Sequence, residues 1–226
     1  MARIVLILGE SGNGKSHSIK SLDPTKTFLI NVIGKDLPFK GWKKDYTPYE
    51  KTTKTGNAII THSSATICSG LKNVVDKLEN INNVVIDDFQ YIMSYEFMRT
   101  IKQKGYEKFN DIADAAFSII QAAQLLRDDI TVFFLAHSEE IFTEAGRKTK
   151  IKTIGKLLDD KITIEGLFTV VLLSRVEITE EGKVKGYFVT QSDGASTMKS
   201  PEGMFDLRID NSLELVLSKI EEYNIG

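Results

Sequence analysis

Short apolar segments alternate with longer amphipathic or polar segments along the chain. A segment that is apolar at consecutive positions, instead of at every second one, predicts a strand buried on both faces. Such strands are expected at Ile4–Leu8, Thr27–Ile33, Ala58–Thr61, Asn83–Asp87 and Thr131–Ala136. Helices are expected between them, at Lys15–Ser21, Ser69–Leu78, Tyr106–Leu126 and Ile154–Asp160.

Alternation of buried strands with helices predicts an α/β fold with a mostly parallel sheet and helices on both faces. Near the C-terminus, Phe168–Ile178 and Lys185–Thr190 are expected to form a β-hairpin across a Glu-Glu-Gly turn. The lysine-rich stretch Lys35–Gly56 is expected to be a loop. With 226 residues and a prior of roughly 100 to 200 residues per domain, we expect a single domain over residues 1–226.

Composition narrows the class of protein. The chain is 42% hydrophobic and 27% charged, as in soluble globular proteins. No apolar stretch approaches the roughly 20 residues that a membrane helix needs, so we expect no membrane span. The lone Cys68 cannot form an internal disulfide, which favours a reducing cytoplasm.

The net charge of −2 means that any contact with nucleic acid must come from local basic clusters. One cluster lies in the N-terminal quarter, around Trp42 and Tyr46, and consists of Lys35, Lys40, Lys43, Lys44, Lys51 and Lys54. The other is a dense run of Arg147, Lys148, Lys150 and Lys152. Both clusters are open to two interpretations, a solvated loop or a nucleic-acid contact.

The segment from Gly9 to Ser16 has the pattern GxxxxGK[ST], directly after an expected strand and at the start of an expected helix. Its residues are Gly9, Glu10, Ser11, Gly12, Asn13, Gly14, Lys15 and Ser16. Glycines allow the backbone to wrap a phosphate with successive N–H groups. We expect Lys15 to neutralise the β and γ phosphates of ATP and the Ser16 hydroxyl to bind Mg²⁺. His17 lies either near the α phosphate or on the helix surface.

Acidic residues end a second buried strand, where Val84-Val85-Ile86 is followed by Asp87 and Asp88. We expect Asp87 to hold Mg²⁺ and Asp88 to orient or deprotonate the attacking water. The alternative is that both aspartates only cap the loop or helix that follows. His137 ends the strand Thr131–Ala136 and is either a sensor of the γ phosphate or a structural histidine.

The order of these segments resembles the RecA-like ATPases, and most closely the phage nucleotide-binding proteins associated with single-strand annealing and recombination. The resemblance rests on the loop GESGNGKS, the strand VVIDD, the histidine in FFLAHSEE, the basic segment GRKTKIK and the final hairpin leading through QSDGASTMKSPEGMF. The first two segments are specific, and the others agree in order and spacing.

The resemblance implies an ATPase that acts on single-stranded DNA, with the basic segment as a mobile DNA-contacting loop. It also implies a homo-oligomer with ATP between subunits, where Lys199 and Arg175 act on the ATP of a neighbour. RecA has a catalytic glutamate after the strand that follows the loop helix, where this chain has Asn31-Val32-Ile33-Gly34. That difference transfers the expected catalytic role to Asp88, with Glu10 as second candidate.

Two other classes of function fit the same loop. A P-loop kinase would transfer phosphate to a small molecule and would need an arginine-rich lid, for which Gly146–Lys152, with its single arginine, is the one candidate. A nucleotide-dependent assembly or loader factor would use ATP to set its oligomeric state. The basic run contains no aromatic residue for stacking bases, so Trp42 and Tyr46 among the N-terminal lysines are the alternative DNA contacts.

Overall fold

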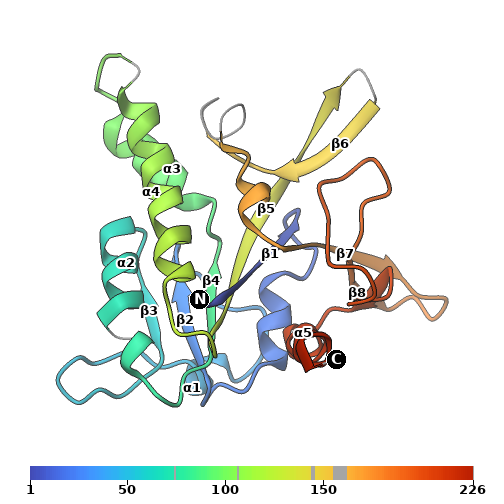
Figure 1. Ribbon diagram of the computed structural model, residues 1–226, viewed down its shortest axis with the longest axis horizontal. Helices are drawn as coiled ribbons and strands as arrows, with labels where there is room; N and C mark the ends of the chain where they lie inside the picture. The colour runs from blue at the N-terminus through green and yellow to red at the C-terminus, as the bar shows by residue number, and fades with distance from the viewer. Residues whose placement is uncertain (74, 106, 144–145, 155–161, 226) are drawn as a thin grey trace.

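One mixed β-sheet organises the computed structural model of this protein, which describes residues 1–73, 75–105, 107–143, 146–154 and 162–225 (Figure 1). Its strands within the described residues are β1 (Arg3–Gly9), β2 (Thr27–Asn31), β3 (Ala58–Ile60), β4 (Asn83–Asp87), β5 (Thr131–Thr143), β6 (Gly146–Ile151), β7 (Val170–Ile178), β8 (Val184–Val189) and β9 (Arg208–Asp210). The strand order is β3-β2-β4-β5-β1-β7-β8-β9, with β6 paired to β5 outside this path.

Most of the strands run parallel. The pairs from β3 to β7 across the sheet are all parallel, whereas β6, β8 and β9 join antiparallel. The core strands β2 and β4 are buried at every position, as the apolar residues at their centres predict, and the polar residues at their ends are buried as well. The expectation of an α/β fold with a mostly parallel sheet and a C-terminal hairpin is therefore confirmed.

Helices cover both faces of the sheet. They are η1 (Ser16–Ser21), α1 (Trp42–Asp45), α2 (Ser64–Asn73), η2 (Val75–Lys77), α3 (Tyr91–Thr100), α4 (Glu107–Gln124), η4 (Ile164–Leu167) and α5 (Leu213–Ile225). The helices α2, α3 and α4 pack on one face, with α3 and α4 side by side in Figure 1. On the other face, η1 and α5 pack against the alternate side chains of the same strands. No described helix has the length and apolar character needed to cross a bilayer.

Several expected elements differ from the structure at their ends. The helix after the glycine-rich loop is a six-residue 3-10 helix that begins at Ser16. The helix expected at Ser69–Leu78 begins earlier, at Ser64, and ends at Asn73 before the separate turn η2. The expected helix Ile154–Asp160 lies almost entirely outside the described residues. Lys35–Gly56 is a loop that contains the short helix α1.

The largest correction concerns β5 and the basic run. The strand was expected to end at Ala136, but β5 continues through His137 to Thr143 and pairs with β6. The segment Gly146–Ile151 is therefore a strand instead of the expected mobile loop. Thr149 and Ile151 are buried, and the N–H of Ile151 donates to Glu165 Oε1 at 2.9 Å. Alternate residues of a strand point to the same face, so Thr149 and Ile151 can be buried together. Because the segment consists mostly of basic residues and threonine, its sequence has too few apolar residues to predict a strand.

Candidate functional site

The glycine-rich loop connects β1 to η1 at the carboxyl edge of the sheet. Gly12 and Gly14 both have φ near +85°, a backbone conformation that favours glycine. A β-carbon at Gly9 would lie 2.9 Å from the carbonyl oxygen of Ser174, and one at Gly14 would lie 3.1 Å from Asn211 Nδ2. These glycines are therefore required both by the turn of the loop and by its close packing against β7 and the segment after β9.

Lys15 lies inside the loop and is 6% exposed. Its Nζ donates to the carbonyl oxygens of Gly9 at 2.7 Å and Glu10 at 2.9 Å. Burial lowers the pKa of Lys15 to about 8, although the charges of Asp88 and Asp87 act in the opposite direction. The ammonium group is thus held by neutral carbonyls, and a bound anion would give it a stronger, charge-assisted partner.

Asp87 is the last residue of β4 and is fully buried. Its Oδ1 accepts a hydrogen bond of 2.9 Å from Ser16 Oγ, a residue 71 positions earlier in the chain. Its Oδ2 is buried with no hydrogen-bond partner among the described residues. Burial, and then the neighbouring charge of Asp88, raise the pKa of Asp87 to about 6.

These two side chains fit a divalent cation. A hydroxyl and a carboxylate are the oxygen ligands that Mg²⁺ uses when it is shared between a protein and a bound phosphate. The buried Oδ2 of Asp87 is an acceptor that lacks a donor, and a cation would balance its charge. Ser16 and Asp87, the two residues predicted to hold Mg²⁺, are therefore brought together by the fold.

Asp88 has a different set of partners. It adopts a left-handed backbone conformation, with φ of +62°, at the point where β4 turns toward α3. Its Oδ2 lies 2.6 Å from Lys35 Nζ, and its Oδ1 lies 3.5 Å from His137 Nε2. Burial alone would raise the pKa of Asp88, but the contacts with His137 and Lys35 hold it below the usual value. Asp88 is therefore a charged carboxylate beside the loop.

His137 lies next to the loop because β5 runs between β1 and β4 in the sheet. In the parallel ladder it is the partner of Gly9. Its N–H donates to Gln90 Oε1 at 3.0 Å, and its ring packs edge-on against Tyr91 at 6.0 Å. His137 thus contacts the site through Asp88 and the first residues of α3, so the sensor role and the structural role both remain compatible with its position.

A pocket of about 810 Å³ opens in front of these groups. Ser11, Gly12 and residues 14–17 line one side of it, and Lys35, Asp88 and His137 line the end beside β4 and β5. The far wall is formed by the β7–β8 hairpin and Asn211. Most of the predicted nucleotide-binding residues, His17 included, therefore line one cavity, whereas Gly9 and Asn13 do not. Glu10, the second candidate for the catalytic acid, has an exposed side chain and does not line it.

Two polar side chains that sequence analysis missed fix the loop from behind. Ser174 Oγ donates to the carbonyl oxygen of Asn13, and Asn211 Nδ2 donates to Ser174 Oγ at 2.9 Å. Both residues are distant from the loop in the chain, and neither belongs to a pattern with a known phosphate-binding role. No signal in the sequence could have assigned them to the loop.

Lys35 is the other missed residue. The sequence placed it in a surface cluster of lysines, whereas the structure places it at the carboxyl end of β2, against Asp88. Burial lowers the pKa of Lys35, but its contact with Asp88 outweighs this effect and raises the pKa above the usual value. The available signal was its position, because Lys35 follows the carboxyl end of the buried strand β2, at the same edge of the sheet as Gly9 and Asp87, the last residues of β1 and β4.

Arg175 and Lys199, the residues expected to act on a neighbouring subunit, lie around β7. The described pocket lining includes neither of them. Arg175 follows Ser174 in the strand, so its side chain leaves the opposite face from the one that contacts the loop. The backbone N–H of Lys199 donates to the carbonyl oxygen of Val171 at 3.0 Å, and the N–H of Val171 donates to the carbonyl oxygen of Lys199 at 2.8 Å.

The basic run forms one strand of the β5–β6 hairpin, which projects from the rest of the sheet (Figure 1). Arg147 forms an ion pair with Glu140, and Lys150 lies 3.4 Å from Glu139. The N–H of Lys152 donates to the carbonyl oxygen of His137 at 2.8 Å, which connects the base of the hairpin to the site. Of the two alternative stacking residues, Tyr46 is only 4% exposed and cannot receive a base, whereas Trp42 is half-buried.

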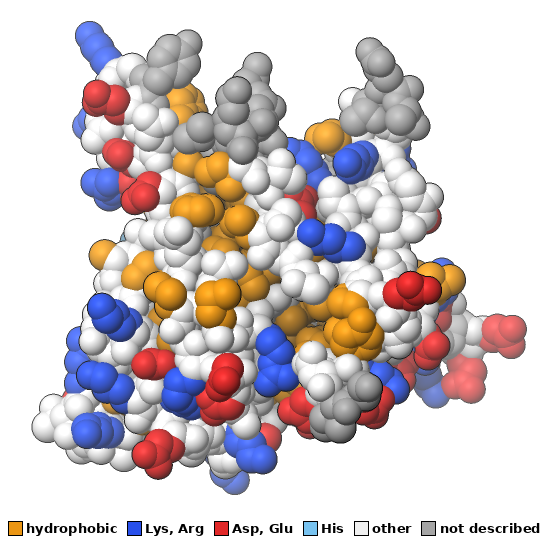
Figure 2. Space-filling view, viewed as in Figure 1, with side chains coloured by type: hydrophobic (Ala, Val, Ile, Leu, Met, Phe, Trp, Pro, Cys, Tyr) orange, Lys and Arg blue, Asp and Glu red, His pale blue; other side chains and the backbone are white. Residues whose placement is uncertain are grey.

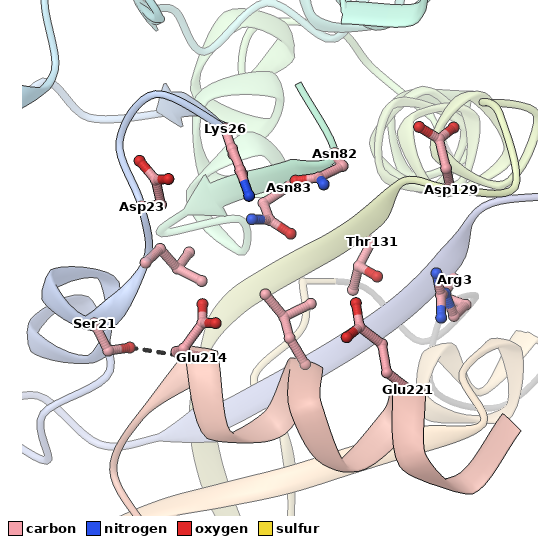
Figure 3. A pocket seen from close by; sticks show the side chains of 12 residues that line it. Arg3, Ser21, Asp23, Lys26, Asn82, Asn83, Asp129, Thr131, Glu214 and Glu221 are labelled. Carbon is pink, nitrogen blue, oxygen red and sulfur yellow. Dashed lines mark hydrogen bonds between the residues drawn. The ribbon is translucent and has the colours of Figure 1, made fainter. Parts of the chain in front are cut away.

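A second pocket, of about 400 Å³, lies at the amino ends of the strands (Figure 3). Arg3 and Lys26 line it together with the acidic residues Asp23, Asp129 and Glu221. It therefore has mixed charge and lies at the opposite edge of the sheet from the glycine-rich loop. The backbone N–H of Glu214, in α5, donates to Ser21 Oγ, in η1, at 3.2 Å. This hydrogen bond connects two sides of the pocket.

The fold and the site together define an α/β protein with a glycine-rich loop packed against a buried pair of aspartates. Models of known protein families give no match to the chain, and comparison with curated proteins gives no significant similarity. The functional assignment therefore depends on the geometry of the site itself.

Proposed function

We propose that this chain is a RecA-like P-loop ATPase that binds ATP with Mg²⁺ and acts on single-stranded DNA in recombination, annealing or replication. The observation that carries the proposal is the 2.9 Å hydrogen bond between Ser16 and Asp87, beside the buried Lys15. These residues come from two parts of the chain, each assigned to ATP and Mg²⁺ on its own sequence pattern. Their contact at the start of η1, beside the pocket, supports both assignments.

In this proposal the loop binds the phosphates through its backbone N–H groups and Lys15. On binding, the Lys15 ammonium leaves the carbonyls of Gly9 and Glu10 for the phosphate oxygens. Ser16 and Asp87 hold Mg²⁺, which supplies neutralisation of phosphate charge. The contacts of Ser174 and Asn211 keep the loop in place, so less conformational entropy is lost when the phosphates bind.

Asp88 is the proposed base. It is charged, it lines the pocket beside the loop, and it does not share the Ser16 contact of Asp87. As a base it would orient a water molecule and accept its proton. His137 positions the carboxylate from the other side, through the contact with Oδ1.

The proposed DNA contact is the β5–β6 hairpin. It carries Arg147, Lys148, Lys150 and Lys152, and β5 is one continuous strand from His137 into the hairpin. The pairing of the strands places Phe142 opposite Arg147, and Phe142 is 87% exposed. An exposed aromatic ring beside cations is the combination that binds single strands, and sequence analysis did not find it because the two residues lie on different strands.

A homo-oligomer with ATP between subunits belongs to the same proposal. Arg175 and Lys199 are outside the pocket of their own chain, as residues that act on a neighbour would be.

Product analysis tests the proposed function. The wild-type protein with ATP and Mg²⁺ should release orthophosphate, and single-stranded DNA should increase the rate. Lys15→Ala should lose ATP binding in calorimetry and keep the wild-type circular dichroism spectrum, since Lys15 makes polar contacts and is outside the apolar core. Phosphate found on an added small-molecule acceptor would indicate a kinase. Binding without turnover would indicate an assembly or loader factor, and unchanged ATP affinity in Lys15→Ala would refute the loop assignment.

A further inference from the structure

Lys35 lies between the acid pair and the pocket. Its Nζ is 2.6 Å from Asp88, whose side chain is 1% exposed, while the Lys35 side chain itself is 46% exposed and lines the pocket. One side of the ammonium group therefore faces a buried carboxylate, and the rest of the side chain is open to the cavity in which phosphates are proposed to bind.

The backbone around Lys35 is fixed by Asn31, which is buried at the end of β2. Asn31 Nδ2 donates to the carbonyl oxygen of Lys35 at 2.8 Å, and Asn31 Oδ1 accepts from the N–H of Gly34 at 2.8 Å. Gly34 has φ of +71°, and a β-carbon there would lie 2.9 Å from Ile60 Cγ2. The turn thus holds the backbone of Lys35 while leaving its long side chain free to change partner.

The charges around Lys35 indicate which partner it would take. Lys35 is close enough to Lys15 that its charge lowers the pKa of Lys15, and both ammonium groups lie near Asp87 and Asp88. Mg²⁺ bound at Ser16 and Asp87 would bring the terminal phosphate of a triphosphate to this end of the pocket. A diphosphate has no group there. A second cation at this place would therefore contact only the triphosphate.

We propose that Lys35 recognises the terminal phosphate of a nucleoside triphosphate bound to its own chain. On binding, the Lys35 ammonium group breaks its ion pair with Asp88 and contacts this phosphate. This inference depends on the proposed function and adds to it the discrimination between tri- and diphosphate. No covalent bond changes in this step. The movement of Lys35 also releases the Asp88 carboxylate, so that it becomes free to orient water only when a triphosphate is bound.

Calorimetric titration with a non-hydrolysable ATP analogue and with ADP, both with Mg²⁺, tests this role. Lys35→Ala should weaken binding of the triphosphate by about 10- to 100-fold, the value of one charge-assisted hydrogen bond. Binding of ADP should change by less than about two-fold. Lys35→Arg should retain part of the discrimination. Lys51→Ala is the matched control, because Lys51 belongs to the same lysine-rich segment but is exposed and outside the pocket lining, and it should leave both affinities unchanged.

If Lys35 only neutralised the charge of buried Asp88, the effect of Lys35→Ala on nucleotide binding would depend on that charge. In the variant Asp88→Asn, residue 88 is neutral and no longer needs a positive charge beside it. The test therefore stays valid in this variant even if Lys35→Ala alone is unstable. Adding Lys35→Ala to Asp88→Asn should still weaken the triphosphate selectively. Equal losses for both nucleotides, or no loss, would overturn the role of Lys35. A wild-type protein that binds neither nucleotide would instead refute the proposed function.

Discussion

Asp87 and Asp88 are adjacent in the chain but have different surroundings. Asp87 is buried against Ser16, and its Oδ2 has no hydrogen-bond partner within the described part of the chain, whereas Asp88 contacts Lys35 and His137. The left-handed backbone of Asp88 separates the two side chains. In the proposed function, these environments assign metal binding to Asp87 and general-base catalysis to Asp88, although the two residues are of the same type.

Substitution by asparagine separates these roles. Asp87→Asn should weaken the Mg²⁺-dependent part of ATP binding by about 10-fold or more, because a charged ligand becomes neutral. Asp88→Asn should retain ATP binding and lose turnover by about 100-fold or more, the usual contribution of a general base. Calorimetry with and without Mg²⁺, together with single-turnover kinetics, measures both. If Asp88→Asn turns over normally, another acid, such as Glu10, provides the base.

The raised pKa of Asp87 predicts how the stability of the free protein depends on pH. The folded-state pKa of about 6 exceeds the ordinary aspartate pKa of 3.8, so the folded state binds more protons between these two pH values. The free energy of unfolding should therefore fall as pH rises from about 4 to about 6, by about 2 to 3 kcal/mol from this group. Urea unfolding of wild type and Asp87→Asn across this range measures the difference. A constant difference between the two proteins would contradict the raised pKa.

At the scale of elements, the β5–β6 hairpin joins the site to the proposed DNA contact. Its cations are not equivalent, since Arg147 and Lys150 lie against Glu140 and Glu139. Lys148 and Lys152 form no ion pair within the described part of the chain. Binding of DNA should therefore depend first on these two lysines.

Replacing Lys148 and Lys152 by alanine should make the salt dependence of single-strand binding shallower. Each phosphate contact contributes about −0.7 to the slope of log affinity against log salt, so the slope should change by about 1.4. Fluorescence anisotropy with a labelled oligonucleotide at several salt concentrations measures this slope. The control is Lys72→Ala with Lys77→Ala, two exposed lysines of α2 and η2.

Phe142→Ala belongs to the same test and should reduce affinity without changing the salt slope. Stacking of one base on an aromatic ring contributes about 1–3 kcal/mol, or roughly 5- to 150-fold in affinity. Because Phe142 is 87% exposed, its removal should leave the free energy of unfolding within about 0.5 kcal/mol of wild type. If neither the charge variant nor Phe142→Ala alters binding, the hairpin does not contact DNA.

At the scale of the whole molecule, the proposal requires contact between copies of the chain. Hydrophobic side chains gather beside α4 on the face shown in Figure 2, and Lys199 and Arg175 lie outside their own pocket. We therefore expect the mass measured by light scattering to increase when ATP and Mg²⁺ are added.

Mixing two inactive variants tests whether the site is shared. Lys15→Ala disables the loop but retains Lys199, and Lys199→Ala has the opposite defect. If each site uses a neighbour's Lys199, an equimolar mixture should recover some ATP hydrolysis, about a quarter of wild type for a random two-subunit contact. A mixture with no recovery at any ratio, and a mass that remains monomeric with ATP, would show that each chain works alone.

The sequence by itself determined the local parts of this protein. Runs of apolar residues determined the buried strands, because a strand covered on both faces needs apolar side chains at every position. The pattern from Gly9 to Ser16 placed the loop, and the end of a buried strand placed Asp87. These features depend on neighbours in the chain, so they are visible without a structure.

Only the tertiary structure decided what lies next to what. Lys35 belongs to a lysine-rich segment whose sequence fits either a solvated loop or a nucleic-acid contact, and only the order β2-β4-β5-β1 brings the end of β2 beside Asp88. Ser174 and Asn211 reach the loop from parts of the chain more than 160 residues away. The extension of β5 depends on pairing with β6, which stabilises a strand of low apolar content through backbone hydrogen bonds. Contacts between distant residues follow from sheet order and packing, which no local pattern encodes.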